Sequence, residues 1–542
     1  MTSTSLQLLK SSISQAMKNQ ARSPLIQQTI VTAEQMQAIE ARIFAAGMPV
    51  TALMEKVAGR ITAKINELYP LSPECKRVGV LVGPGHNGGD ALVVARELHF
   101  RGYEVSCYQP FQRLKELTAT HAQYVSSLGI PLVKEIGSLG ECQLLIDGWF
   151  GFGLSRDLAD PVFSAIATLN QWHIPTVSID LPSGIHTDTG AVMGTAVQAT
   201  HTLCLGLWKR AFLQDQALPY IGQAHLIDLD IPLADITAIL GSEPVIRRLT
   251  PSIVAESLPL PRSPITHKYK EGHALLICGS QRYMGAAILA GLAARSSGVG
   301  MLSIAVPAGL KLAIALRIPD AVIIACPETE TGAIDQLPDF VDLAKYDAIA
   351  CGPGLTLDAL SVVQTVLDAS PPLLLDADGL NALATIGVEA IAHRPDPTVI
   401  TPHLGEFRRL FPALGEELVQ GGDRITIVQA AAQQSGAILV LKGARTVIAT
   451  PSDRLWVNPE SSPALARGGS GDVLTGLMVG LMAQAIAHRA PSDPSQQSCA
   501  IEPIVATAVW CHAQAGMVAC EQRGERGVDA ETLTQFLRPI LL

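Results

Sequence analysis

Short apolar runs alternate with longer segments of helical character along almost the whole of this 542-residue chain. In the first half, residues 77–83 (RVGVLVG) predict a strand, residues 90–102 a helix and residues 103–109 the next strand. Strands that alternate with helices in this way are typical of parallel sheets with helical crossover connections. The pattern therefore predicts an α/β protein.

The alternation breaks between residues 232 and 266, where prolines are scattered and no period is sustained. Beyond this stretch the rhythm of strands and helices resumes, and residues 437–458 predict a hairpin with its tight turn at residues 451–454. We therefore predict two α/β domains with three-layer sheets, a Rossmann-like one at residues 31–240 and a second at residues 266–542, joined by a linker at 241–265. Residues 1–30 lack acids and any apolar signal core, so we expect a poorly ordered tail, although a transit peptide shares this composition.

Composition limits the possible partners and compartments. A net charge of -10 and the lack of a basic stripe disfavour nucleic acid as a partner. The apolar runs are interrupted well short of a membrane span, so no membrane partner is expected. The ten cysteines are scattered singly without a CxxC pair. Reduced thiols of this kind favour a cytoplasmic location.

A glycine-rich segment near the end of the chain, ARGGSGDVLTG at residues 466–476, leads into a long apolar helix. Helix N-termini preceded by glycines commonly bind phosphate. Because a carboxylate beside phosphate repels it, Asp472 is predicted to accept a proton from a hydroxyl that attacks phosphorus. The alternative is that Asp472 only caps the helix, since Asp is among the best N-cap residues.

A second glycine loop, GPGHNGGD at residues 83–90, follows a predicted strand and contains G-x-G-x-x-G. A dinucleotide dehydrogenase would need an acid at the end of the next strand, about 20 residues on, to bind the ribose. That strand ends instead in Cys107-Tyr108-Gln109-Pro110. The loop is then either a set of backbone N–H groups that receive a polar ligand or a tight strand-to-helix turn.

The first half as a whole resembles the NAD(P)H-hydrate epimerase family, known as the YjeF N-terminal domain. The matching segments occur in the family's order: TAEQMQAIEARIFAAGMPVTALMEKVAG, GPGHNGGDALVVARELHFRG, LLIDGWFGFGLSRDL, IDLPSGIHTDTG and ATHTLCLGLWKR. The resemblance implies that a hydrated nicotinamide nucleotide binds to His86, Asn87, Gly88, Gly89, Asp90, Gly151, Phe152, Gly153, Leu154, Ser155, Arg156, Asp157 and Asp180. It also implies a potassium ion held by Asn87, Asp147 and Ser183. His86 stands where the family commonly has Asn.

Inversion at C6 of such a hydrate requires the hydroxyl to leave and to return on the other face. Because the ring nitrogen can expel the hydroxyl, one acid/base group suffices. Asp180, at a predicted strand end, is the first candidate for this catalytic group, and Lys209 is a weaker one. The alternative for Asp180 is a carboxylate that caps a helix or turn.

The second half resembles the ribokinase superfamily and, more closely, the ADP-dependent NAD(P)H-hydrate dehydratases. The matching segments are HKYKEGHALLICGS, MGAAILAGLAARSSGVGMLSIAVP, CGPGL, LLLDADGLNAL, TPHLGEFRRL, LVLKGARTVIA and GGSGDVLTGLMVGLMAQ. The resemblance implies a ribokinase-like fold in which Asp472 deprotonates the C6 hydroxyl for attack on the β-phosphate of ADP. It further implies magnesium, a hydrate site at Ala286, Gly354, His403 and Asp472, and a nucleotide site at Lys442, Gly443, Ala444, Arg445, Thr446 and Gly471.

The roles of several residues in the second half are left undecided by the sequence. Asp376 and Asp378 either assist magnesium or end a strand, and Glu406 either supports the metal or places negative charge in a helix first turn. Arg467 and Thr356 depart from the family, which usually has a small polar residue and a glycine there.

Together the two halves resemble the bifunctional NAD(P)H-hydrate repair enzymes, which combine an isomerase with a lyase. We expect the chain to form a homo-oligomer. Two alternatives remain at this stage. One is a kinase of a small vitamin precursor with a regulatory first half. The other is a non-catalytic scaffold, since related first domains serve RNA metabolism in this way.

Overall fold

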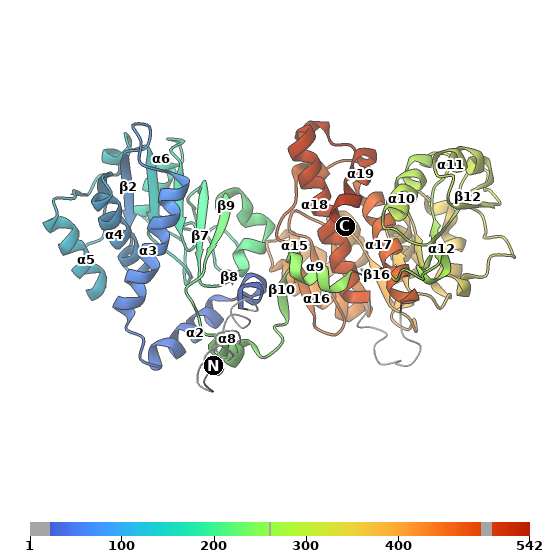
Figure 1. Ribbon diagram of the computed structural model, residues 1–542, viewed down its shortest axis with the longest axis horizontal. Coiled ribbons are helices and arrows are strands. Elements are labelled where there is room, and N and C mark those ends of the chain that lie inside the picture. Colours follow the sequence, from blue (N-terminus) through green and yellow to red (C-terminus); the bar gives the residue numbers. More distant parts are fainter. Residues whose placement is uncertain (1–21, 259–261, 489–500, 542) are drawn as a thin grey trace, which may run out of the picture. The chain divides into compact units, whose positions relative to one another are not determined.

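A computed structural model describes residues 22–258, 262–488 and 501–541, and the chain divides into two units at residues 1–244 and 245–542 (Figure 1). Within the described residues, the N-terminal unit contains a parallel sheet in the order β4-β3-β2-β5-β6-β7-β9. Its strands are β2 (Arg77–Val82), β3 (Glu104–Tyr108), β4 (Leu132–Val133), β5 (Leu144–Gly148), β6 (Thr176–Ile179), β7 (His201–Leu205) and β9 (Gln223–Ile227). Its helices are α2 (Ala33–Ala45), α3 (Val50–Leu68), α4 (His86–Phe100), α5 (Glu116–Ser127), α6 (Val162–Leu169), α7 (Leu218–Ile221) and α8 (Leu233–Leu240).

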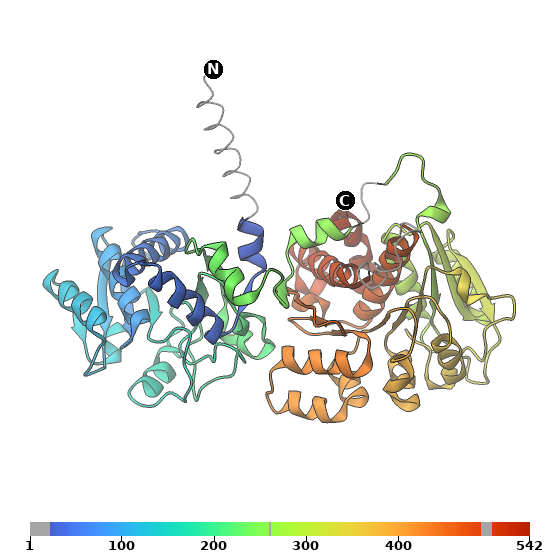
Figure 2. The ribbon, with the colours of Figure 1, turned by 90° about the horizontal axis from the view of Figure 1, so that it is seen from below.

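Helices cover both faces of this sheet. Along β2, Val78 and Val80 pack in a core cluster with α3 and α4, whereas Leu81 joins a separate cluster with α6. Successive side chains of a strand point to opposite faces, so β2 is buried from both sides. Figure 2 shows α6 on the opposite side of the sheet from α3 and α4. The N-terminal unit is therefore a three-layer α/β structure, as predicted.

The segment before residue 31 differs from the expected tail. Residues 22–28 are helical, and Ile26 and Ile30 are buried in the N-terminal unit. Strand β1 (Ile30–Val31) pairs in parallel with β8 (Trp208–Lys209), and Arg22 forms an ion pair with Asp228. The tail prediction was wrong for residues 22–30, because partners about 180 residues away bury this short apolar segment. Residues 1–21 lie outside the described part of the chain.

The C-terminal unit contains, in its described part, a sheet in the order β10-β19-β18-β17-β16-β15-β14-β11-β12-β13. Only β18 runs antiparallel to its neighbours. The strands are β10 (Ile246–Arg248), β11 (His273–Ile277), β12 (Met301–Pro307), β13 (Val322–Cys326), β14 (Ala348–Cys351), β15 (Leu373–Leu375), β16 (Thr398–Ile400), β17 (Ile438–Leu441), β18 (Val447–Ala449) and β19 (Leu455–Val457). The hairpin predicted around residues 451–454 is confirmed as the β18–β19 connection, and β17 extends it to three antiparallel strands.

Helices also flank this second sheet on both sides, as Figure 2 shows for α17 and α18 against α15 and α16. The helices are α9 (Pro251–Ser257), α10 (Met284–Ser296), α11 (Lys311–Arg317), α12 (Leu360–Leu367), α13 (Asp378–Ile386), α14 (Leu404–Leu410), α15 (Pro412–Val419), α16 (Arg424–Ser435), α17 (Ser470–Ala487), α18 (Ile501–Arg523) and α19 (Ala530–Leu541). In the largest core cluster, α10, α17 and α18 pack on residues such as Leu276 and Leu374 of the sheet. The second three-layer α/β unit is confirmed.

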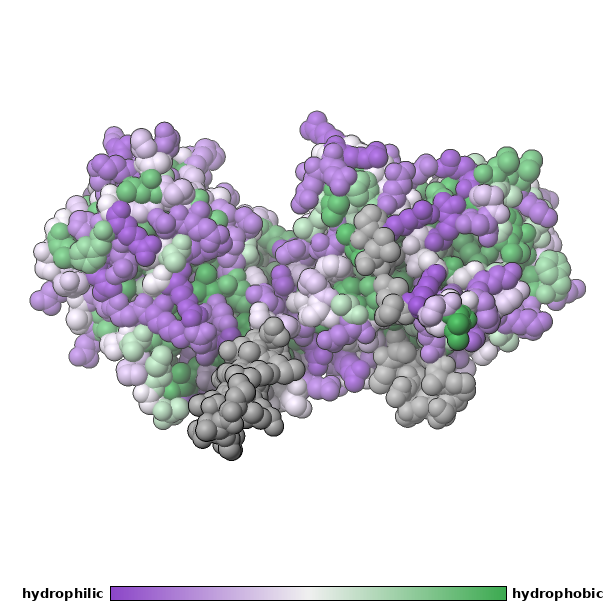
Figure 3. Space-filling view, viewed as in Figure 1, coloured by the Kyte–Doolittle hydropathy of each residue, from purple (hydrophilic) through white to green (hydrophobic). Residues whose placement is uncertain are grey.

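Helices α17 and α18 are long and apolar enough to cross a membrane, but 72% and 67% of their most apolar windows are buried inside the unit. They are core helices of the second domain. The face seen in Figure 3 is mainly hydrophilic, with small apolar patches. One such patch lies at α11, which exposes Leu312 and Leu316.

The expected linker at 241–265 is also shorter than predicted. Strand β10 pairs in parallel with β19 at the edge of the second sheet. The next helix, α9, buries Ile253 and Val254 against α18. A three-residue strand and a seven-residue helix are too short to show a periodic pattern of apolar residues. Because prolines surround both elements, the segment resembles a linker in the sequence. Residues 245–258 belong to the C-terminal unit.

Candidate functional site

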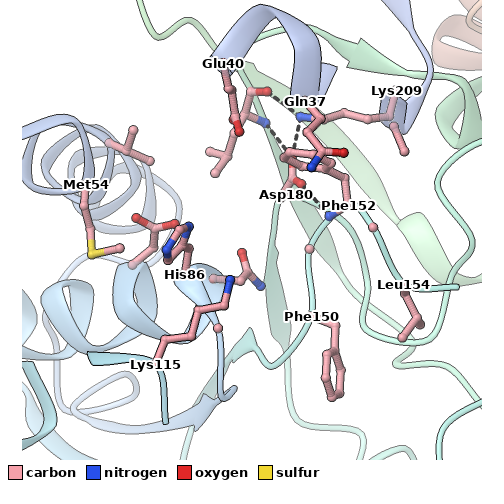
Figure 4. Close-up of a pocket in the computed structure, with 18 of the residues that line it drawn as sticks. Gln37, Glu40, Met54, His86, Lys115, Phe150, Phe152, Leu154, Asp180 and Lys209 are labelled. Atoms are coloured by element: carbon pink, nitrogen blue, oxygen red, sulfur yellow. Dashed lines mark hydrogen bonds and ion pairs between the residues drawn. The ribbon is translucent and has the colours of Figure 1, made fainter. Parts of the chain in front are cut away.

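A cavity of about 960 Å³ lies at the carboxyl ends of β2, β5 and β6 in the N-terminal unit (Figure 4). Ligands of open α/β sheets collect at such strand ends. Most of the residues predicted to bind the hydrate line this cavity, namely His86, Asn87, Asp90, Gly151, Phe152, Gly153, Leu154, Ser155, Arg156 and Asp180. Gly88 and Gly89 are buried within the first turn of α4, and Asp157 is exposed; these three do not line the cavity.

Glycines allow the start of α4 to pack against the end of β2. A Cβ atom on Gly88 would lie 1.9 Å from the carbonyl oxygen of Gly83, a distance no side chain tolerates. Helix α4 therefore begins at His86, four residues before the predicted start, because the glycines form its first turn. Gly85, His86 and Asn87 at this helix start line the cavity, and the unpaired N–H groups of a helix start favour a polar ligand.

Asp180 and Lys209 form a buried ion pair in the cavity wall. The Lys209 Nζ atom lies 2.5 Å from Asp180 Oδ1, and the two side chains are 0% and 3% exposed. The same ammonium also donates to the carbonyl of Leu205. The backbone N–H of Phe152 donates to Asp180 Oδ2 at 3.0 Å. Asp180 has a positive φ of 69°, so the chain turns sharply there and brings the carboxylate to the 151–156 loop.

Asp147 and Ser183, two of the three predicted potassium ligands, lie in direct contact behind the cavity. Ser183 Oγ donates to Asp147 Oδ1 at 2.6 Å, and the Ser183 N–H donates to Asp147 Oδ2 at 2.8 Å. Burial raises the pKa of Asp147, and hydrogen bonds from Ser183, Ser178 and Trp149 oppose the rise. Asn87, the third ligand, has a buried side-chain nitrogen without a hydrogen-bond partner in the described residues.

Sequence reasoning missed the wall of the cavity that α2 supplies. Gln37, Glu40 and Phe44 line it from successive turns of one helix face (Figure 4 labels the first two). Burial raises the pKa of Glu40 to about 7, with Asp180 adding to the rise and Lys209 opposing it. The i, i+3, i+7 spacing of these three residues was visible in the sequence. Nothing in the neighbouring sequence indicated that this face of α2 lies near the ends of β6 and β8. Lys115, at the start of α5, also lines the cavity.

In the C-terminal unit, three polar residues follow three adjacent strands of the sheet. Asp376 follows β15, His403 comes shortly after β16, and Lys442 follows β17. Lys442 Nζ lies 2.7 Å from Asp376 Oδ1, and Thr475 of α17 donates to Asp376 Oδ2 at 2.8 Å. Asp376 thus does more than end a strand, because it joins the ammonium group to the helix that carries Asp472.

Asp472 lies in the first turn of α17, which begins at Ser470. The N-cap is Gly469, in the left-handed region with φ 90°, so capping does not account for Asp472. Burial and then the charge of Asp376 raise the pKa of Asp472 to about 7, and Lys442 opposes the rise. A carboxyl with this pKa can take a proton near neutral pH. The His512 ring lies 3.0 Å from the Ser470 carbonyl beneath this turn.

Glu406 and His403 form the N-terminal cap of α14. His403 Nδ1 accepts from the N–H of Gly405 at 2.9 Å, and Glu406 Oε2 accepts from the N–H of His403 at 2.9 Å. Glu406 also lies 4.0 Å from Lys442 Nζ. The His403 side chain is 56% exposed, and its Nε2 atom lies 3.5 Å from Glu406 Oε1.

The remaining predicted residues lie around these groups, in loops and in the first turns of α10 and α17. Gly354 and Ala286 are adjacent, since a Cβ on Gly354 would lie 3.0 Å from that of Ala286. A Cβ on Gly471 would lie 3.6 Å from Lys442 Nζ. Residues Gly443, Ala444, Arg445 and Thr446 form the turn between β17 and β18. Arg467 is exposed and donates to the carbonyl of Arg526 at 2.7 Å.

Asp378 begins α13 and accepts at 2.9 Å from the N–H of Thr356. Thr356 has φ 66° and ψ 165°, a conformation that is essentially restricted to glycine. Its hydroxyl is buried without a hydrogen-bond partner in the described residues. Thr356, which stands where the family usually has a glycine, is therefore a point of backbone strain beside the predicted hydrate site.

Comparison with known proteins agrees with this division. Residues 50–211 match the family described as YjeF-related protein N-terminus, and residues 274–539 match the family described as NAD(P)H-hydrate dehydratase. The chain is 32% identical to a solved ADP/ATP-dependent NAD(P)H-hydrate dehydratase from Bacillus subtilis, co-crystallised with ATP and Mg²⁺. That similarity covers 54% of this chain and 96% of the other, with a TM-score of 0.45.

Longer matches are found among curated relatives. The bifunctional NAD(P)H-hydrate repair enzyme Nnr of Thermosynechococcus vestitus is 52% identical over 94% of this chain and 97% of its own length. The enzyme of the same name from Synechocystis is 49% identical over 94% of both chains. With matches of this identity and extent, the chain belongs to the family of bifunctional NAD(P)H-hydrate repair enzymes.

Proposed function

We propose that the two units divide NAD(P)H-hydrate repair between them. The N-terminal unit interconverts the R and S hydrates at C6, and the C-terminal unit dehydrates the S form with ADP, giving NAD(P)H, AMP and phosphate. The observation that carries the proposal is the placement of Asp472, a half-buried carboxyl at a glycine-rich helix start, beside the Lys442–Asp376 pair.

In the dehydratase unit, the oxygen of the C6 hydroxyl attacks the β-phosphate of ADP, and Asp472 takes the proton of this hydroxyl. AMP leaves, and phosphate becomes bonded to C6. Phosphate is a far better leaving group than hydroxide, so the C6–O bond then breaks with loss of a proton from C5. Lys442 and the N–H groups of the first turn of α17 stabilise the negative charge that develops on the transferred phosphoryl group.

Magnesium fits the charge of this site. Asp376, Glu406 and Asp472 place three carboxylates around the ammonium of Lys442, and Asp378 adds a fourth beside Asp472. This excess of negative charge repels phosphate. Asp376 and Asp378 would hold magnesium, which supplies positive charge to the phosphates of the nucleotide. Mg²⁺ commonly binds through one or two carboxylates together with phosphates and water.

Potassium fits the buried oxygen atoms behind the first cavity. The Asp147 carboxylate is 0% exposed, and no ion pair balances it among the residues that the structure describes. A buried carboxylate without a cation is costly. Together with the Ser183 hydroxyl and the Asn87 amide, it would hold a hard monovalent cation that orders the 149–153 segment, whose Phe150 N–H donates to Ser183 Oγ at 2.9 Å.

The test is to give the purified protein a mixture of both NADPH-hydrate epimers with ADP, magnesium and potassium. The absorbance of the reduced nicotinamide should return completely. Recovery that stops at the S fraction would contradict the epimerase assignment. A stable phosphorylated product without NADPH would favour a small-molecule kinase instead. Light scattering on the same sample tests the proposed homo-oligomer.

The matched variants are Asp472→Asn and Asp320→Asn. The second removes an exposed carboxylate of the same unit that pairs with Arg295. Recovery should be lost in the first variant and unchanged in the second. Equal recovery in both would contradict the role of Asp472.

A further inference from the structure

Glu40 is a half-buried carboxyl that lines the N-terminal cavity. It lies on α2, three residues from Gln37, and both line the cavity. In the described part of the chain, no hydrogen bond or ion pair involves its carboxylate. Figure 4 shows Glu40 at the same end of the cavity as Asp180 and Lys209. A free carboxyl in this position is available to a bound ligand.

Asp180, the candidate from sequence, is in the opposite situation. Its Oδ1 atom accepts from Lys209 Nζ at 2.5 Å and from the Leu205 N–H at 3.3 Å. Its Oδ2 atom accepts from the Phe152 N–H at 3.0 Å. A carboxylate that is 3% exposed and engaged at both oxygens is poorly placed to exchange a proton with substrate.

The surroundings of Glu40 suit a group that changes its charge during a reaction. Burial raises its pKa to about 7, so both protonation states are accessible at neutral pH. A smaller cavity of about 250 Å³ lies on its other side, with apolar walls that include Met36, Ile43 and Met48. Other charged or titratable groups line the two cavities together with Glu40, namely Glu34, His86, Asp90, Lys115, Arg156, Asp180, Asp188 and Lys209 in the larger one and Lys56, Asp230 and Asp235 in the smaller one.

We propose that Glu40 is the catalytic acid/base residue of C6 interconversion, and that Asp180 is a positioning residue that holds Lys209 and the Phe152 loop. This proposal rests on the proposed epimerase function. The protonated carboxyl gives its proton to the C6 hydroxyl, and the C6–O bond breaks as the ring nitrogen donates its electron pair. Water leaves, and the nicotinamide ring becomes a cation.

Water then adds to the opposite face of C6, and one of its protons returns to the Glu40 carboxylate through water in the cavity. Atoms and charge are balanced over the cycle, since one hydroxyl leaves and one water adds. The Asp180–Lys209 pair contributes no net charge, so the Glu40 carboxylate supplies negative charge beside the cationic ring. No oxidant, reductant or nucleotide is consumed.

The test uses the intact protein without ADP, so that the dehydratase has no co-substrate. Pure R-NADPH hydrate is supplied, and the S form is measured by chromatography over time. Glu40→Gln should lower kcat about 100-fold with little change in KM, the size expected for loss of general acid/base catalysis. Glu40→Asp should restore part of the rate. The wild-type rate should fall as the pH rises through about 7, and this break should disappear in Glu40→Gln.

Glu67→Gln is the matched control, because Glu67 is exposed on α3 and pairs with Lys64. It should keep the wild-type rate and pH profile. If Glu40→Gln keeps both as well, the role of Glu40 is wrong. If Asp180→Asn alone removes the pH break, the acid/base role belongs to Asp180.

A wild-type protein that interconverts no epimer would instead contradict the proposed function itself. Melting curves show whether Glu40→Gln is folded. If Glu40→Gln is unfolded, Glu40→Asp is tested in its place. The pH at which the rate of this variant breaks should shift, while that of Glu67→Gln should not. An unshifted break would then contradict the proposal.

Discussion

Lys442 Nζ and Asp376 Oδ1 lie 2.7 Å apart although β16 separates the two strands that they follow. Thr475 completes the contact from α17 by donating to the other carboxylate oxygen. The pair thus connects two strand ends and a helix start around Asp472. This arrangement has consequences for stability as well as for chemistry.

Asp376→Ala should destabilise the C-terminal unit by roughly 3 kcal/mol, because it removes the carboxylate that pairs with the largely buried ammonium of Lys442 and leaves the Thr475 hydroxyl without its acceptor. Thr475→Val should cost only about 1 kcal/mol, the size of one hydrogen bond. Chemical denaturation followed by circular dichroism measures both changes. Equal effects of the two substitutions would mean that the ion pair is not the dominant interaction of Asp376.

The dehydratase rate should depend on pH through Asp472. The base must be deprotonated to act, and its pKa is raised to about 7. We therefore expect the rate to rise with pH up to about 7 and to level off above it. Asp472→Asn should lower the rate by about 100-fold or more. A wild-type rate that is flat between pH 5 and 8 would contradict this assignment.

His512 should make the C-terminal unit less stable in acid. Burial lowers its pKa to about 4, below the usual value near 6.5. Between these values the unfolded chain binds the proton and the folded chain does not, so stability is present above pH 6.5 and is lost as the pH falls towards 4. The loss from this group is roughly 3 kcal/mol. His512→Asn should flatten this part of the stability curve, and an unchanged slope would contradict the explanation.

Substitution by alanine should change the stability of the N-terminal unit much more at Gly88 than at Gly85. A Cβ on Gly88 would lie 1.9 Å from the Gly83 carbonyl oxygen, whereas nothing lies within 4 Å of a Cβ on Gly85. Gly88→Ala should destabilise the N-terminal unit by about 3 kcal/mol through overpacking. Gly85→Ala should stay within about 0.5 kcal/mol. Differential scanning calorimetry measures both, and similar melting temperatures would contradict the close packing of this loop.

Thr356→Gly should stabilise the C-terminal unit. A strained residue in this backbone region costs about 1–3 kcal/mol, and glycine loses about 0.5–1 kcal/mol through its greater freedom when unfolded. The net gain should be about 1 kcal/mol. Thr356→Ala keeps the Cβ and serves as the control. Urea denaturation should rank Gly above Ala, and the reverse order would show that the strain is relieved elsewhere.

The sequence by itself determined the two α/β units and pointed to the glycine loops at which their candidate sites lie. The spacing of apolar residues is a local property, and it predicted the strands at 77–83 and 103–109 and the hairpin at 451–454. The glycine motifs likewise marked the starts of α4 and α17, because close packing of the chain there excludes a side chain.

Only the tertiary structure decided which distant segments meet. Residues 22–30 and 246–254 are packed because β8, β19 and α18 bury them, and their own sequence is too short to predict this. Likewise, Glu40 faces Asp180 and Lys209 only because α2 folds over the ends of β6 and β8. Burial and charge depend on neighbours far away in the chain, and so does the pKa of each of these groups.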